Sequence, residues 1–297
     1  MAPEITLCLG GGAARGFAHI GALRAITENN IAFHRIIGIS MGSIVGAIFS
    51  IMPDVKFLEE RMIQLVKSPA FASSVLGSWT RNLDESPRTF FKKAQKIYTS
   101  TTMLRKFFTA SGVVDHEEVN NIIFPLLPPI RMSSTEIPFV TSAVNIKNGT
   151  LRIFQGEDSL RSSVIASASM PLIFPPREIK GEYFVDAGVT DKLGVETAQR
   201  IEAGKIIVID VSDEKLAENL PRSAFDVMLK TEEISSWHRR DVQLATANIS
   251  IQPIQGNYHW ADYSAYAEFI EMGFEATRLR ISDMKILTRQ KRIFGIF

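Results

Sequence analysis

The sequence predicts a single α/β domain whose sheet is covered by helices on both faces. Short, continuously apolar runs alternate with helical patterns in the first 52 residues, and this alternation returns after residue 138. The chain has 297 residues and is 45% hydrophobic, so it can bury a large core without disulfides. A formal net charge of +1 gives no overall attraction to nucleic acid. The single cysteine, Cys8, excludes an internal disulfide and a cysteine-based zinc site, which fits a reducing compartment.

A strand-helix-strand unit followed by a second helix is expected at the N-terminus. A strand from Ile5 to Leu9 leads through a glycine loop into a helix from about Gly16 to Asn29. The next strand, Arg35 to Ile39, leads through a tight turn into a helix from Gly42 to Met52. The apolar stretch from Ile36 to Met52 is at the short limit for crossing a bilayer and contains three glycines. A buried strand running into a buried helix therefore explains it better than a membrane span.

Residues 55–135 interrupt the alternation. Proline, serine and glycine breaks divide helical patterns there, which predicts an inserted helical cap. From Ser86 to Ala110 there are six basic residues and no acidic one, interleaved with aromatic side chains. This composition fits a cap helix with a solvated basic face, or an interfacial lid attracted to anionic headgroups. No nucleic-acid motif accompanies it, so nucleic acid is not an expected partner.

The alternating pattern in the C-terminal half predicts a continuation of the sheet. Phe139 to Asn145 and Thr150 to Gln155 form a candidate hairpin around Asn148-Gly149. Further strands are expected at 183–185, 205–211 and 249–253, and helices at 160–169, 195–202, 222–248 and 263–280. The tail, 281–297, mixes basic and apolar residues and could pack on its own domain, on a second subunit or on a membrane.

The glycine loop between the first strand and the first helix, Gly10 to Gly16, is a candidate anion site because backbone amides point outward at a helix N-terminus. A dinucleotide fingerprint fails because Arg15 occupies the position of its last glycine. A phosphate-binding P-loop fails because Phe17 and Ala18 stand where lysine and serine or threonine are needed. A cradle for a small oxyanion remains, with Arg15 reinforcing or bracing it; the alternative is a purely structural turn.

Gly38-Ile39-Ser40-Met41-Gly42 matches the G-x-S-x-G pattern of a nucleophile elbow, at a predicted strand-to-helix junction. The glycines allow the chain to turn sharply enough to present a hydroxyl. Spacing alone would also fit a solvent-facing turn serine. The apolar strand before it and the oxyanion loop upstream favour Ser40 as a nucleophile.

Two kinds of base could activate Ser40. One is a histidine, and the order Ser40, Asp186, then His238 or His259 would match an α/β-hydrolase. However, the elbow comes too early in the chain for the strands that precede the nucleophile in that fold. The other candidate is Asp186 itself, which ends a predicted strand and is followed by Ala187 and Gly188.

Four motifs in this order resemble the patatin-like phospholipase family. Gly11 to Gly16 is similar to its oxyanion loop, Gly38 to Gly42 to its nucleophile motif, and Asp186 to Gly188 to its acid motif. A fourth family block resembles Ala166 to Pro171, a small-residue helix that must end near the proline. The resemblance covers residues 5–195 well and residues 212–297 only weakly.

The resemblance implies a three-layer α/β/α sandwich with a mostly parallel central sheet and an inserted helical cap. It also implies a Ser40–Asp186 catalytic dyad, an oxyanion hole around Gly11, Gly12 and Ala13, and no metal or cofactor. The expected activity is hydrolysis of fatty acyl esters in phospholipids or other lipids. Residues expected to support the site are Arg15, Gly16, Gly38, Gly42, Pro171 and Gly188.

The resemblance leaves rivals and two departures. A Ser-His-Asp carboxylesterase and a noncatalytic lipid-binding protein remain as alternatives. Ala13 and Ala187 replace family glycines, and each is easily accommodated only at negative φ. The N-terminus lacks the pattern of a secretory signal, so a cytoplasmic location is expected, with peripheral contact at the inner membrane surface and a homo-oligomer as open options.

Overall fold

The computed structural model describes residues 4–81, 111–112, 114–212, 220–221, 224–256 and 258–289. In this part of the chain all strands belong to one eight-stranded sheet with the order β5-β6-β3-β2-β1-β7-β8, and β4 also pairs with β3. Their bounds are β1 Ile5–Leu9, β2 Arg35–Gly38, β3 Phe139–Asn145, β4 Leu151–Phe154, β5 Arg177–Ile179, β6 Glu182–Asp186, β7 Lys205–Ile209 and β8 Ile249–Ile251. The adjacent strands β8, β7, β1, β2 and β3 run parallel, whereas β4 and β6 run antiparallel to β3. The predicted, mostly parallel α/β sheet is confirmed.

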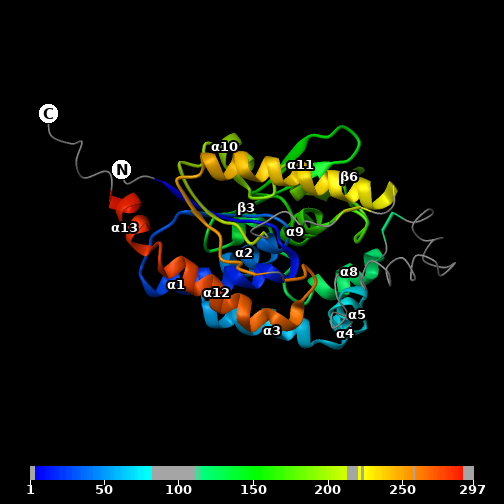
Figure 1. The fold of residues 1–297 in the computed structure, drawn as a ribbon, viewed down its shortest axis with the longest axis horizontal. Helices are drawn as coiled ribbons and strands as arrows, with labels where there is room; N and C mark the ends of the chain where they lie inside the picture. Colours follow the sequence, from blue (N-terminus) through cyan, green and yellow to red (C-terminus); the bar gives the residue numbers. More distant parts are fainter. Residues whose placement is uncertain are drawn as a thin grey trace.

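Helices cover both faces of this sheet (Figure 1). One face carries α10 (Val195–Arg200) and α11 (Ala224–Thr246), which contribute to a small apolar cluster. The other face carries α1 (Ala18–Glu28), α2 (Met41–Ile51), α3 (Val55–Lys67), α9 (Leu160–Ala168) and α12 (Tyr266–Arg278), which contribute to the main core. The two clusters lie on opposite faces of the sheet, so the domain has three layers: helices, sheet and helices.

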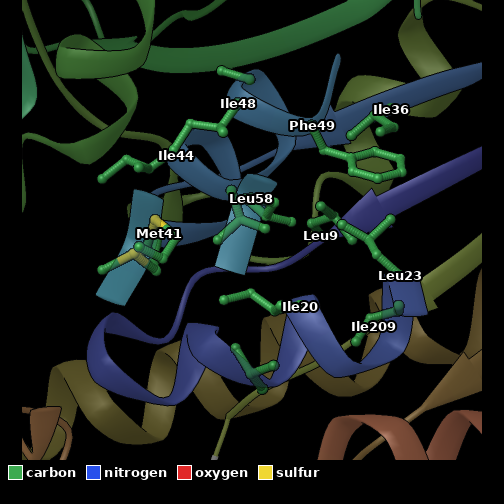
Figure 2. Packing of buried hydrophobic residues seen from close by; sticks show 14 of the residues in the cluster. Leu9, Ile20, Leu23, Ile36, Met41, Ile44, Ile48, Phe49, Leu58 and Ile209 are labelled. Carbon is green, nitrogen blue, oxygen red and sulfur yellow. The ribbon is translucent and has the colours of Figure 1, made fainter. Parts of the chain in front are cut away.

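Alternation along the strands explains why both faces need helices. In β1, Leu7 and Leu9 belong to the main core and Cys8 to the smaller cluster, and all three are buried. Successive side chains of a strand point to opposite faces, so a strand apolar at every position is buried on both sides. Figure 2 shows the main core with side chains of β1, β2, β7, α1, α2 and α3 packed together: Leu9, Ile20, Leu23, Ile36, Met41, Ile44, Ile48, Phe49, Leu58 and Ile209.

The described parts of 55–135 are helical, as the sequence predicts. They contain α3, α4 (Pro69–Ser73), α5 (Val75–Arg81) and α8 (His116–Ile123). The basic segment from Ser86 to Ala110 lies outside the described residues. Within the described residues, no helix has the length and hydropathy that a membrane span requires.

Two features of the C-terminal half differ from the expectations. The last predicted helix is α12, preceded by the short turn Tyr263–Ala265, but α13 (Ile281–Arg289) follows it within the expected tail. Met284 and Leu287 of α13 are buried in the main core, so this part of the tail packs on its own domain. The strand β5 was not predicted, because none of its three residues is buried and they contain no apolar run.

Candidate active site

The strands β2 and β6 direct their carboxyl ends toward the same part of β3. Gly38 of β2 pairs with Thr141, and Asp186 of β6 pairs with Ala143 a little farther along β3. Because β2 runs parallel and β6 antiparallel to β3, their carboxyl ends approach each other. Ser40 lies two residues after the end of β2, so the topology brings it toward Asp186.

Ser40 occupies the turn between β2 and α2 with a φ of 54° and a ψ of −123°. Such a backbone conformation is strained for any residue with a side chain. A Cβ on Gly38 would lie 2.4 Å from the Gly42 carbonyl oxygen, and a Cβ on Gly42 would lie 2.1 Å from the Leu9 carbonyl oxygen. Glycine at both positions therefore allows the sharp turn that the G-x-S-x-G pattern predicts.

Asp186 is buried at the end of β6, with 5% of its surface exposed. Its carboxylate accepts a hydrogen bond from the Gly188 N–H at 2.7 Å, and the Ser40 side chain interacts with it. Burial raises the pKa of Asp186 to about 6, although the interaction with Ser40, the Gly188 hydrogen bond and the positive charge of Lys192 act in the opposite direction. The carboxylate is therefore ionised at neutral pH and a better proton acceptor than an exposed aspartate.

The small-residue block at the end of α9 contacts both residues. The Ser40 N–H donates to the Ser167 hydroxyl oxygen at 3.2 Å, and the Asp186 N–H donates to the Ser169 carbonyl oxygen at 2.9 Å. Pro171 follows the end of this helix and is exposed. The sequence marked this block as closely packed but did not identify Ser167 or Ser169 as partners.

The glycine loop lies beside Ser40, since a Cβ on Gly11 would lie 3.1 Å from the Ser40 Cβ. Its first two amides are used within the fold: the Gly10 N–H donates to the Ile209 carbonyl and the Gly11 N–H to the Lys192 carbonyl. Within the described residues, no backbone acceptor pairs with the amides of the next two residues, Gly12 and Ala13. These two amides are thus the ones in the loop that can meet a developing negative charge.

Two further motif residues brace the loop. Arg15 is buried, and its Nε donates to the Gly12 carbonyl at 3.5 Å. Gly16 lies against Met41, where a Cβ would come within 2.2 Å of the methionine Cγ. Among the described residues, no group of three or more His, Cys, Asp or Glu side chains is placed to hold a metal ion.

Ala13 does not meet the expectation of a negative φ, because its φ is +49°. Ala187 keeps a negative φ, as expected. The left-handed region costs an L-residue about 1 kcal/mol or more, which a well-packed domain of this size can absorb. The family glycine at position 13 is thus explained by backbone geometry, and the alanine adopts it with strain.

We expect Ala13→Gly to raise the unfolding free energy by about 1 kcal/mol, because it removes this strain. The melting temperature should rise by about 2 °C, measured by differential scanning calorimetry. Ala14→Gly is the matched control: Ala14 is the next residue of the same 3-10 helix and has no positive φ, so glycine there should lower the melting temperature. A lower melting temperature for Ala13→Gly would contradict this account.

Within the described residues, the hydrogen bonds seen at histidine side chains involve neither Ser40 nor Asp186. His19 is fully buried, its Nε2 lies 2.8 Å from the Gly10 carbonyl oxygen, and burial lowers its pKa to about 4. It is therefore a neutral donor that supports the glycine loop. The other four histidines have these positions: His34 lies beside Ile5 at the amino end of β1, His116 starts α8, His238 is exposed on α11, and His259 lies against Trp260, whose carbonyl accepts the Ala14 N–H.

Comparisons with known proteins point to one family. The model of the patatin-like phospholipase family matches residues 7–198, more than half of the chain. An uncharacterized NTE family protein of Mycobacterium bovis is 25% identical over 213 residues, which cover 71% of this chain and 49% of that protein. The neuropathy target esterase sws of Drosophila melanogaster is 29% identical over 214 residues, covering 71% of this chain and 13% of that protein. The lysophospholipase NTE1 of Meyerozyma guilliermondii is 24% identical over 296 residues, covering 91% of this chain and 19% of that protein. This chain spans about half the length of the first relative and less of the other two.

Proposed function

The chain belongs to the patatin-like phospholipase family, and we propose that it hydrolyses fatty acyl ester bonds of phospholipids with a Ser40–Asp186 dyad. The observation that carries this proposal is the pairing of the Ser40 side chain with the buried Asp186 carboxylate, at the strained turn beside the glycine loop. The names of two relatives, an esterase and a lysophospholipase, support an ester substrate and, for the second, a phospholipid.

In the first half of the reaction, the Ser40 Oγ attacks the acyl carbonyl carbon while Asp186 takes the hydroxyl proton. The carbonyl π electrons move to the oxygen and give a tetrahedral oxyanion. When this intermediate collapses, the bond to the lipid alcohol breaks and the alcohol leaves with the proton from Asp186. The product is an acyl ester on Ser40.

In the second half, water attacks the acyl ester and gives its proton to Asp186. The second tetrahedral intermediate collapses, the bond to the Ser40 Oγ breaks, and the proton returns to that oxygen. A free fatty acid leaves, and both residues regain their starting states. One carboxylate can thus carry the proton in both directions, so the cycle requires no histidine.

Backbone amides near Ser40 are the proposed oxyanion donors. Gly12 and Ala13 stand at the start of the 3-10 helix Ala13–Phe17, which continues into α1. Met41 begins α2 directly after the nucleophile, where the first amides of a helix have no partner within the helix. Helix N-termini carry partial positive charge, so both helices favour an anion here. The Gly11 amide is less suited because it already donates to Lys192.

A fluorophosphonate probe tests this proposal directly. It should form a covalent adduct that mass spectrometry maps to Ser40, and Ser40→Ala should remove the adduct. Release of fatty acid from phospholipid micelles is the second measurement. Labelling at another residue would reject Ser40 as the nucleophile, and tight lipid binding without labelling would favour a noncatalytic lipid-binding protein.

The pH profile provides a prediction about the base. Since Asp186 must be ionised to accept the proton and its pKa is about 6, kcat/KM should fall tenfold per pH unit below about pH 6. Above pH 6, ionisation of Asp186 should no longer change kcat/KM. Initial rates between pH 4.5 and 8 on a soluble ester, with stability checked at each pH, measure this limb. An acid limb near pH 4 would be inconsistent with a buried base.

A further inference from the structure

The helix α11 lies outside the residues matched by the family, yet two of its buried side chains reach the loops of the site. Arg240 and Gln243 are one helical turn apart and only 3% and 8% exposed. In Figure 1, α11 crosses the sheet on the face opposite α1 and α12. Its contacts with the loops of the site thus come from that face of the sheet.

Gln243 makes hydrogen bonds with two residues of the loop that follows Asp186. Its Oε1 accepts a hydrogen bond from the Leu193 N–H at 3.0 Å, and its Nε2 donates to the Thr190 carbonyl at 3.3 Å. Between these two residues, the Lys192 carbonyl accepts the Gly11 N–H at 2.9 Å. Gln243 therefore fixes the peptide to which the glycine loop is attached.

Arg240 fixes the other support of the same loop. Its Nε donates to Asp210, whose second carboxylate oxygen accepts the Ser212 N–H at 2.9 Å. Asp210 follows β7, and the last residue of β7, Ile209, accepts the Gly10 N–H at 3.1 Å. Between Asp210 and Ser212 lies Val211, which packs so closely on Gly12 that a Cβ there would lie 2.5 Å from its Cγ2.

From these contacts we infer that α11 positions the oxyanion loop, with Gln243 and Arg240 as positioning residues. The inference rests on the proposed function for its catalytic consequence. Attachment of α11 to the domain explains these contacts less well. Burial of apolar side chains would be enough to attach the helix, and buried ion pairs add little stability. Gln243 instead binds directly, and Arg240 through the Asp210 carboxylate, to the backbone segments that hold Gly10, Gly11 and Gly12. Active sites need such support because small displacements of a donor cost large rate factors.

Gln243→Leu tests the inference, since leucine fills a similar volume without the two hydrogen bonds. In the folded variant, the Gly11 amide should exchange with deuterium at least about tenfold faster, measured on the peptide that contains residues 10–14. At 25 °C, kcat should fall about tenfold and KM should stay within about twofold. Arg240→Lys keeps a positive charge beside Asp210 but loses the guanidinium geometry, so it should speed exchange of the Gly10 amide.

Met284→Ala is the matched control. It makes a cavity in the core beneath α13 and should lower the melting temperature with unchanged kcat and unchanged exchange at Gly11. Unchanged Gly11 exchange in folded Gln243→Leu would overturn the inference, as would faster exchange with an unaltered kcat. If the wild-type protein hydrolyses no lipid ester while Gly11 exchange still accelerates, the proposed function fails and the structural role of α11 stands.

Discussion

Ser40→Ala is expected to lower phospholipid hydrolysis by a factor of about 10⁴ or more while the protein stays folded. Without the hydroxyl no acyl ester can form, and residues that act as nucleophile in serine hydrolases typically account for losses of this size. The backbone strain at Ser40 is the same for alanine, so stability should change little. Initial rates of fatty acid release, with circular dichroism and thermal unfolding of both proteins, measure the effect.

The controls separate this dyad from a triad. Ser73→Ala removes an exposed hydroxyl on α4 and should leave the rate unchanged. His238→Ala and His259→Ala should also retain near-normal turnover, because Asp186 alone carries the proton. Loss of activity in either histidine variant would support a Ser-His-Asp carboxylesterase instead. Full activity of Ser40→Ala would remove the serine mechanism altogether.

The central strands could be predicted because each is short and mostly apolar. Ile5–Leu9 and Lys205–Ile209 are buried on both faces, so composition alone marks them. The edge strand Arg177–Ile179 carries no such signal, because partly buried residues at an edge need not be apolar. The helix Ile281–Arg289 was not predicted, because Lys285 and Arg289 lie among its apolar residues, which include the buried Met284.

The candidate site could be predicted in part for a similar reason. The glycine and serine motifs stand at strand ends, and parallel strands collect their ends at one edge of the sheet. The occupation of the Gly11 amide by Lys192 and the positive φ of Ala13 depend on tertiary contacts, so no local pattern encodes them. The same holds for Gln243, one of many polar residues on a long helix.

Asp186→Asn should abolish activity and stabilise the protein at the same time. Asparagine cannot take the Ser40 proton, so the hydrolysis rate should fall by a factor of about 10³ or more. In the wild-type protein, burial raises the pKa of Asp186 from 3.8 to about 6. The folded state therefore binds this proton more tightly than the unfolded state does, and the resulting stability is lost as the pH rises through 6.

Asparagine does not ionise, so Asp186→Asn avoids the cost of a buried charge at high pH. Its unfolding free energy relative to wild type should increase between about pH 4 and pH 6 and remain constant above that, with a gain of up to about 3 kcal/mol. Urea unfolding of both proteins at pH 4.5, 6 and 8 measures the difference, in which the other titrating groups largely cancel. A pH-independent difference would mean that the carboxylate is not strained by burial, and its role as a base tuned to neutral pH would then lose its physical cause.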